Sequence, residues 1–333
     1  MKRWMFAVMA AVMFAGAFAA AGEVIGVAMP TQSEERWVLD LQTMVSEGRK
    51  LGLDVRTQIA RNDQMQQNNQ IDQLVAQGCR VIIIAPHDGD SAAAAVNKAR
   101  QDGVKIIAYD RLITNCEYEA FAGFNSVQIG NLQGKWLTER APKGNYICLS
   151  GAPTDFNSQI YHDGAMEYIR PLVDKGDITI VVDQPVIDWQ PVNAQRIVEN
   201  ALTKANNDVV AVLAPNDGTA GGAIAALEAQ GLAGKVFVSG QDAEVSAIQR
   251  IVRGVQGMTV LVDTRELGKA AVTMAQRMLR NEPIDDLTKG HVEYNGVMDI
   301  PAVLLDTASV DITNYGELLF DSGYMKREDV FGD

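Results

Sequence analysis

The chain has 333 residues, with 42 acidic against 29 basic side chains and a formal net charge of −13 at pH 7. Such an acidic surface repels nucleic acid and anionic lipid, so a nucleic-acid partner is not expected. The length exceeds one comfortable hydrophobic core and favours two domains. Three cysteines and three histidines, scattered along the chain, provide neither a disulfide framework nor a metal-ligand spacing.

Residues 1–21 have the pattern of a secretory signal peptide. Lys2 and Arg3 precede an apolar stretch from Trp4 to Ala21, whose last residues are small and suited to cleavage. The alternative is an uncleaved membrane anchor, since these 18 residues could barely cross a bilayer. The small residues at the end of the stretch favour the signal peptide. We therefore expect an exported, soluble mature chain.

After this leader, short apolar runs rich in Val and Ile alternate with amphipathic stretches such as "SEERWVLDLQTMVSEGRKLG". This alternation predicts an α/β fold in which parallel sheets are covered by helices on both faces. The expected strands are residues 24–29, 53–59, 81–85, 104–109, 120–124, 145–150, 178–183, 209–214, 235–239 and 258–262.

One unit of this pattern occurs twice. "APHDGDSAAAAVNKARQDGVKIIAYDR" begins at Ala85, and "APNDGTAGGAIAALEAQGLAGKVFVSGQDA" begins at Ala214. Each copy has a strand end, a Pro-x-Asp-Gly turn, an Ala-rich helix, a glycine stop and a second strand that ends in an aspartate, Asp110 or Asp242. Two copies indicate a domain duplication. Because ligands sit at the carboxyl ends of parallel strands, we expect these aspartates to line opposite walls of one cleft.

The residues at the predicted strand ends suit a carbohydrate. Carboxylates, amides and guanidinium groups can pair with sugar hydroxyls, and a flat indole ring can pack against the C–H face of a pyranose. Alternatives remain for single members: Asp88 as a turn former or helix cap, Asp110 with Arg111 as a local ion pair, and the tryptophans as ordinary packing. The candidate ligand-binding residues are Arg36, Trp37, Asp88, Asp110, Arg111, Asp155, Asn157, Trp189, Asn216 and Asp242.

Motifs for other chemistries are missing from the sequence. No GxGxxG follows a predicted strand, "ELGKAAV" lacks the glycine of a Walker A loop, and there is no GxSxG or calcium-binding loop. No cofactor and no metal are therefore expected. An exported carbohydrate-active enzyme that uses paired cleft carboxylates is the alternative function. Carboxylates that come from two separate domains suit the fixed spacing of a glycosidase poorly, so a binding protein is favoured.

Several segments carry a family resemblance: "AMPT" with "RW", "IIAYDRLI", "DGAM", "NDGTAGGAIAAL", "VSGQDAEV" and "DTREL". With these, the chain resembles the periplasmic sugar-binding proteins of ABC transporters in the ribose/galactose/xylose-binding cluster, above all the xylose-binding and multiple-sugar-binding members. The resemblance covers essentially the whole mature chain. It implies a type I periplasmic-binding-protein fold, with two Rossmann-like lobes joined by a three-strand hinge and closing over one monosaccharide.

The resemblance also implies boundaries and partners. The N-terminal lobe is expected at 24–124 plus 259–292, and the C-terminal lobe at 125–258 plus 293–333. The protein would bind an aldopentose or aldohexose, such as xylose, glucose, galactose or arabinose, in the periplasm. It would deliver this sugar, as a monomer, to the inner-membrane permease of an ABC importer, and a chemoreceptor or sensor is a further expected partner.

One departure and one further alternative accompany the resemblance. Val262 stands where the relatives carry a lysine that reaches the sugar, and its loss removes a donor to a hydroxyl or carboxylate. Sugar-responsive transcription regulators share the two-lobed fold. The export signal, the acidic charge and the absence of an N-terminal helix-turn-helix argue against that class.

Overall fold

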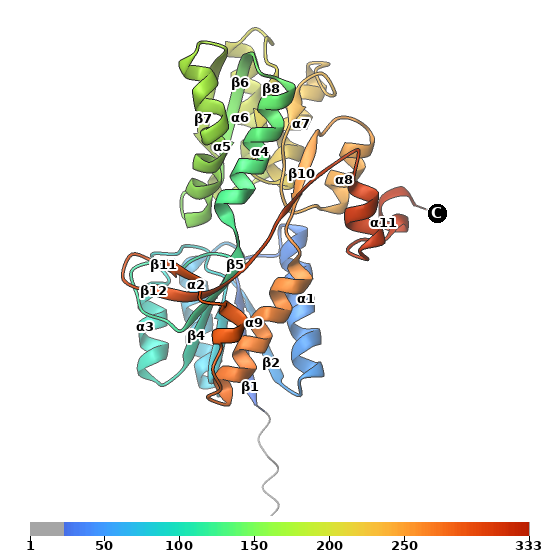
Figure 1. Cartoon of the computed structure of the whole chain (residues 1–333). Coiled ribbons are helices and arrows are strands. Elements are labelled where there is room, and N and C mark those ends of the chain that lie inside the picture. Colours follow the sequence, from blue (N-terminus) through green and yellow to red (C-terminus); the bar gives the residue numbers. More distant parts are fainter. Residues whose placement is uncertain (1–22, 333) are drawn as a thin grey trace, which may run out of the picture.

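The computed structural model describes residues 23–332, so the predicted signal peptide at 1–21 lies outside the described residues. The chain forms two α/β lobes, drawn one above the other in Figure 1. Within residues 23–332, every helix is too short or too polar to cross a bilayer.

The first lobe is built on a seven-stranded sheet in the order β11-β12-β5-β4-β3-β1-β2, parallel except for the β11–β12 pair. Its interior strands are apolar runs whose alternate side chains serve two hydrophobic layers. In β3, Val81 and Ile83 face one layer, and Ile82 and Ile84 face the other. The strands are β1 (Val24–Met29), β2 (Asp54–Ile59), β3 (Val81–Ile84), β4 (Lys105–Tyr109), β5 (Ala120–Phe124), β11 (Val292–Tyr294) and β12 (Asp299–Leu305).

Helices cover both faces of this sheet. Helices α1 (Glu35–Lys50) and α9 (Thr264–Leu279) contribute to one hydrophobic layer. Helices α2 (Gln64–Ala76) and α3 (Ala93–Gln101) contribute to the other layer, and the short α10 (Asp285–Thr288) precedes β11.

The second lobe repeats the design with a smaller, fully parallel sheet in the order β7-β6-β8-β9. Helices α4 and α5 pack on one face, and α6 and α7 pack on the other. The elements are α4 (Ser126–Arg140), β6 (Gly144–Ser150), α5 (Phe156–Asp174), β7 (Ile178–Pro185), the 3₁₀ turn η1 (Ile187–Trp189), α6 (Pro191–Lys204), β8 (Ala211–Leu213), α7 (Asp217–Ala229), β9 (Phe237–Val238) and α8 (Val245–Val252).

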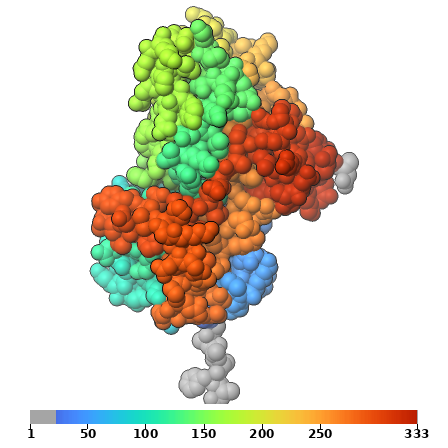
Figure 2. Space-filling model, viewed as in Figure 1, coloured from blue at the N-terminus to red at the C-terminus, as the bar shows by residue number. Residues whose placement is uncertain are grey.

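The chain crosses between the lobes three times: from β5 to α4 at 124–126, from β10 to α9 at 261–264, and from β12 to β13 at 305–308. Strands β10 (Met258–Leu261) and β13 (Ala308–Asp311) pair antiparallel beside the second lobe. The π-helix η2 (Gly316–Asp321) and α11 (Arg327–Phe331) then end the described chain. Figure 2 shows the last part of the chain, in orange-red and red, running from the first lobe to the side of the second. The predicted α/β class, with two lobes and parallel sheets, is confirmed.

The predicted lobe boundaries need correction at two places. Residues 302–305 pair with 121–124 of β5, so the segment 293–305 extends the first sheet and does not belong to the second lobe. The apolar run in "IPAVLL" completes that sheet, and the sequence reading had assigned no strand there. Conversely, β10 pairs with β13 and lies with the second lobe. We therefore propose lobes of 24–124 plus 264–305 and of 126–261 plus 308–332.

Candidate functional site

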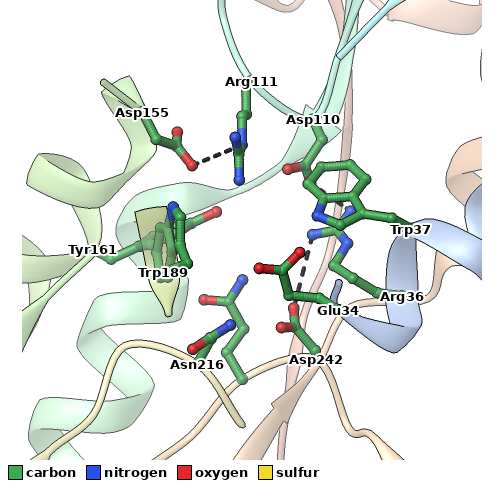
Figure 3. A pocket seen from close by; sticks show the side chains of 11 residues that line it. Glu34, Arg36, Trp37, Asp110, Arg111, Asp155, Tyr161, Trp189, Asn216 and Asp242 are labelled. Carbon is green, nitrogen blue, oxygen red and sulfur yellow. Dashed lines mark hydrogen bonds and ion pairs between the residues drawn. The ribbon is translucent and has the colours of Figure 1, made fainter. Parts of the chain in front are cut away.

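A cavity of about 310 Å³ lies where the two lobes meet. Eight of the ten candidate residues line it, together with three that the sequence analysis did not name (Figure 3). The lining residues are Glu34, Arg36, Trp37, Asp110, Arg111, Asp155, Tyr161, Trp189, Asn216, Gln241 and Asp242.

Both lobes supply this lining from the carboxyl ends of their strands. In the first lobe, Asp110 follows β4, and the start of α1 brings Arg36 after β1. In the second lobe, Asn216 follows β8 and Asp242 follows β9. The repeat had predicted that Asp110 and Asp242 lie on opposite walls of one cleft, and the structure has them there.

A buried charge network centres on Arg36. Its Nη2 lies 2.7 Å from Oδ1 of Asp110, its Nε lies 3.2 Å from Oδ2 of Asp40, and its Nη1 lies 3.7 Å from Oδ1 of Asp242 in the other lobe. The Tyr109 hydroxyl donates to Oδ1 of Asp40. Burial acts to lower the pKa of Arg36, but Asp110, Asp40 and Asp242 raise it above its ordinary value. Arg36 therefore stays charged.

Arg111 makes the second charge contact between the lobes. Its Nε lies 2.8 Å from Oδ2 of Asp155, although the N–H is not aimed at that oxygen. The Trp37 ring lies under both guanidinium groups, with its centroid 4.4 Å from Cζ of Arg36 and 5.1 Å from Cζ of Arg111. The alternative of a local Asp110–Arg111 ion pair is therefore wrong, since the two residues pair with different partners.

The ring of Trp189 fits in its position because Gly151 has no side chain. A Cβ on Gly151 would lie 2.1 Å from Cη2 and Cζ2 of the Trp189 ring. The indole is 7% exposed and lines the cavity, and its Nε1 has no hydrogen-bond partner. The ring thus packs edge-on against backbone while its polar atom stays available.

Three cavity residues adopt a left-handed backbone that side chains other than glycine rarely take. The φ angles are 61° at Asp110, 57° at Trp189 and 101° at Asp242. Such conformations cost of the order of 1–3 kcal/mol each and cluster at ligand clamps. Their concentration around one cavity supports its choice as the candidate functional site.

Several polar atoms of this cavity are buried without a hydrogen-bond partner. They are Oε2 of Glu34, Nε of Arg111, Nε1 of Trp189, Oε1 of Gln241 and Oδ1 of Asp242. Each such atom costs about 1–3 kcal/mol when it stays unpaired. Burial also raises the pKa of Asp242 to about 6 against the opposing effect of Arg36, and raises that of Glu34. The cavity is therefore suited to a ligand that is rich in hydrogen-bonding groups.

Two candidate residues do not line the cavity. Asp88 is a turn former, as its alternative reading proposed, because its Oδ1 accepts from the N–H groups of Asp90 and Ser91 at 3.0 and 2.9 Å. Asn157 lies behind the cavity wall, where its Nδ2 donates to the backbone oxygen of Asp110 at 2.6 Å. It thereby joins the lobes and holds the segment that carries Asp110.

Three lining residues were missed by the sequence analysis. Glu34 is the N-cap residue of α1, two positions before Arg36, and Gln241 directly precedes Asp242. Tyr161 lies about one helical turn beyond Asn157 on α5. Adjacency to residues already chosen was the available signal, whereas the direction of each side chain depends on tertiary packing.

Outside the cavity, a pair of glutamates joins the lobes. Oε1 of Glu244 accepts from the N–H of Glu35, the first residue of α1, at 3.2 Å. Oε2 of Glu35 accepts from the N–H of Val245, the first residue of α8, at 3.3 Å. Neither helix has a side-chain cap from its own N-cap residue, so each lobe caps a helix of the other.

The remaining residue predictions concern Val262 and metals. Val262 is fully buried in the hydrophobic core and does not line the cavity. Across residues 23–332, no three His, Cys, Asp or Glu side chains are grouped to hold a metal ion.

Two facing α/β lobes with a polar cleft between them define a solute-binding architecture. Residues 25–283 match the periplasmic binding protein domain, which covers most of the chain. The chain belongs to the periplasmic binding protein family.

Known relatives agree with this assignment. The chain is 38% identical to the D-xylose-binding periplasmic protein of Haemophilus influenzae over 92% of both chains, and equally similar to that of Escherichia coli. It is 32% identical to the multiple sugar-binding periplasmic receptor ChvE of Rhizobium radiobacter over 96% of both chains. A carbohydrate transporter solute binding protein from Chloroflexus aurantiacus, solved in complex with D-glucose, superposes with a TM-score of 0.87 at 30% identity, covering 92% of this chain and 98% of its own.

These relatives confirm the family resemblance and the type I fold. They are binding proteins of transport systems and receptors, not enzymes, as the sequence analysis expected for this chain.

Proposed function

We propose that this protein is a periplasmic receptor that captures one monosaccharide, an aldopentose or aldohexose, in the interlobe cavity and delivers it to an ABC importer. The observation that carries the proposal is the set of buried, unpartnered polar atoms around a cavity of about 310 Å³ that also holds two tryptophans. A pyranose offers hydroxyls for those atoms and a C–H face for an indole.

The contacts that the cavity offers provide enough free energy for micromolar binding of a sugar. Hydrogen bonds to charged groups contribute about 1.5–3 kcal/mol each, and a micromolar dissociation constant needs about 8 kcal/mol. Asp110, Asp242 and Arg111 lie where hydroxyls could reach them, and Trp189 offers a ring. A few such bonds and one ring contact therefore exceed the cost of association.

The interlobe contacts support a mechanism of hinge closure. Arg36 with Asp242 and Arg111 with Asp155 join the lobes in the cavity, and the reciprocal helix caps join them outside it. A ligand shifts an opening and closing equilibrium only when it binds the closed state better. A sugar that contacts Asp110 and Asp242 together meets that condition.

The location and partners are part of the proposal. The amino-terminal pattern supports export with cleavage near residue 21, and the relatives named as periplasmic proteins support a periplasmic site. A monomer would then present its closed form to an inner-membrane permease. A chemoreceptor or sensor is a second proposed partner.

Calorimetric titration of the mature chain with xylose, glucose, galactose and arabinose tests the proposal. We expect at least one sugar to bind with a dissociation constant of about 1 µM or below, with one site per chain. Asp242→Asn should weaken that binding about tenfold or more. Asp208→Asn, which changes a residue outside the cavity, should leave it unchanged. Failure of all four sugars to bind would refute the proposal.

The enzyme alternative has its own test. Asp110 and Asp155 are held by Arg36 and Arg111, and pairing with a guanidinium group does not suit the general acid that a glycosidase needs. Incubation with aryl glycosides should release no sugar. Turnover that disappears in Asp110→Asn would favour the enzyme.

A further inference from the structure

The unpartnered atoms of the cavity include both hydrogen-bond acceptors and hydrogen-bond donors, in unequal numbers. Three are acceptors, on Glu34, Gln241 and Asp242, and two are donors, on Arg111 and Trp189. An ionised carboxylate can only accept hydrogen bonds, and an indole N–H can only donate. The cavity therefore demands more donors than acceptors from its ligand.

The charges of the lining residues are also unequal. Two arginines, Arg36 and Arg111, oppose four carboxylates, on Glu34, Asp110, Asp155 and Asp242. Both arginines are already in close contact with a carboxylate, Arg36 with Asp110 at 2.7 Å and Arg111 with Asp155 at 2.8 Å. Glu34 and Asp242 are thus the two carboxylates of the lining with the weakest compensation, since Arg111 and Arg36 act on Glu34 without a close ion pair and Arg36 stays 3.7 Å from Asp242.

Glu34 and Asp242 lie close to each other, one from each lobe. Figure 3 shows the two carboxylates side by side below Trp37. Asp242 keeps only a distant cation, with its Oδ1 3.7 Å from Nη1 of Arg36, and it is 3% exposed. Burial first, and then the charges of Asp110 and Glu34, raise the pKa of Asp242 to about 6. A cation placed here would relieve this repulsion, and an anion would add to it.

We infer that the cavity selects sugars by charge, with Glu34 and Asp242 as the specificity-determining pair: it accepts neutral and amino sugars and rejects uronates and sugar phosphates. This inference rests on the proposed function. An ammonium group beside Glu34 supplies three donors to a side of the cavity that lacks them. A carboxylate or phosphate offers mainly acceptors, next to two carboxylates, and each arginine of the cavity is already in close contact with a carboxylate.

Glu34→Gln is the informative variant. Gln has the shape of Glu and keeps one acceptor oxygen, so it removes the charge and little else. Glu47→Gln is the matched control, because it makes the same change on the same helix, outside the cavity, where Glu47 pairs with Lys50.

The experiment is calorimetric titration at about pH 6.5, where an amino group is protonated. The neutral sugars are D-glucose and D-xylose, the amino sugars are their 2-amino-2-deoxy counterparts, and the acid is D-glucuronate. Glucuronate differs from glucose in the oxidised C6 and from xylose by one carboxylate on C5. The comparison is made against whichever neutral sugar binds the mature chain.

We expect the amino sugar to bind at least as tightly as its neutral parent, and glucuronate to bind about 100-fold more weakly or not at all. Glu34→Gln should weaken the amino sugar relative to its parent by about tenfold, and Glu47→Gln should leave this ratio unchanged. If a neutral sugar binds but the ratio does not move in Glu34→Gln, or glucuronate binds equally well, the inference is wrong and the proposed function stands. If none of the four neutral sugars of the first titration binds, the proposed function fails, and this inference fails with it.

Discussion

The contact between Gly151 and Trp189 allows a sharp test of how the cavity is built. Gly151 has no positive φ, so Gly151→Ala adds a methyl group without backbone strain. That methyl carbon would lie 2.1 Å from two ring carbons of Trp189. Because carbon atoms pack best at about 3.5–4.0 Å, the ring must move by about 1.5 Å or leave its rotamer.

The magnitude follows from this displacement. A side chain forced about 30° from its rotamer costs about 0.5–1.5 kcal/mol, and the displaced ring also loses contact with the ligand. We therefore expect Gly151→Ala to weaken sugar binding by about 1–2 kcal/mol, which is about 5- to 30-fold. The assay is calorimetric titration with the tightest sugar found for the parent protein, alongside thermal unfolding.

Two comparisons separate this mechanism from general damage. Gly316→Ala adds the same methyl group where no atom lies within 4 Å, and it should bind sugar like the parent. In a Trp189→Ala background, Gly151→Ala should have no further effect, because the ring that it displaces is gone. Equal losses from Gly151→Ala with and without Trp189 would refute the reasoning, as would an affinity within about twofold of the parent.

Three further predictions concern single residues. Asp88→Ala removes a turn cap and should lower the unfolding free energy by about 1 kcal/mol, while sugar affinity stays within about twofold of the parent. In the same titrations, Asp110→Asn should weaken sugar binding about tenfold or more. Arg111→Met leaves the buried Asp155 without its cation and should lower the unfolding free energy by about 3 kcal/mol, so an unchanged denaturant midpoint would contradict the importance of this contact. Burial, with the charges of Asp217, Asp242 and Glu35, raises the pKa of Glu244 to about 8, whereas the unfolded chain releases this proton near 4.5. The folded form therefore holds a proton that the unfolded chain has lost, and the free energy of unfolding falls as pH rises from about 5 through 8. Glu244→Gln should flatten this decline, by the order of 2 kcal/mol at pH 8.5 in thermal unfolding, and parallel pH curves for the two proteins would count against it.

Much of the fold could be predicted because the strands are short, apolar and regularly spaced. Runs such as "VIII" are buried on both faces, and this requires helices above and below them. The carboxyl-terminal part was harder. The strand β12 was not expected. It pairs with β5, about 180 residues earlier in the chain, and no local sequence pattern reveals that this edge of β5 needs a partner strand.

The site could be predicted to the level of strand ends but not of side-chain direction. Asp110 and Asp242 follow from the repeat, since equivalent positions of duplicated units meet across the cleft. Asp88 also follows a predicted strand, but its carboxylate caps its own turn instead of lining the cavity. Glu34 was missed because a glutamate before a helix usually faces solvent, and only the approach of the second lobe encloses it.

The exchange of helix caps between Glu35 and Glu244 means that neither lobe is complete by itself. The first turn of α1 holds Arg36 and Trp37, directly after Glu34. When the hinge opens, that turn loses the carboxylate that fixes its leading amide and becomes free to fray. The sugar-facing side chains of the first lobe would then become ordered only when the second lobe closes onto them. Sugar recognition and lobe closure would therefore be completed in the same step.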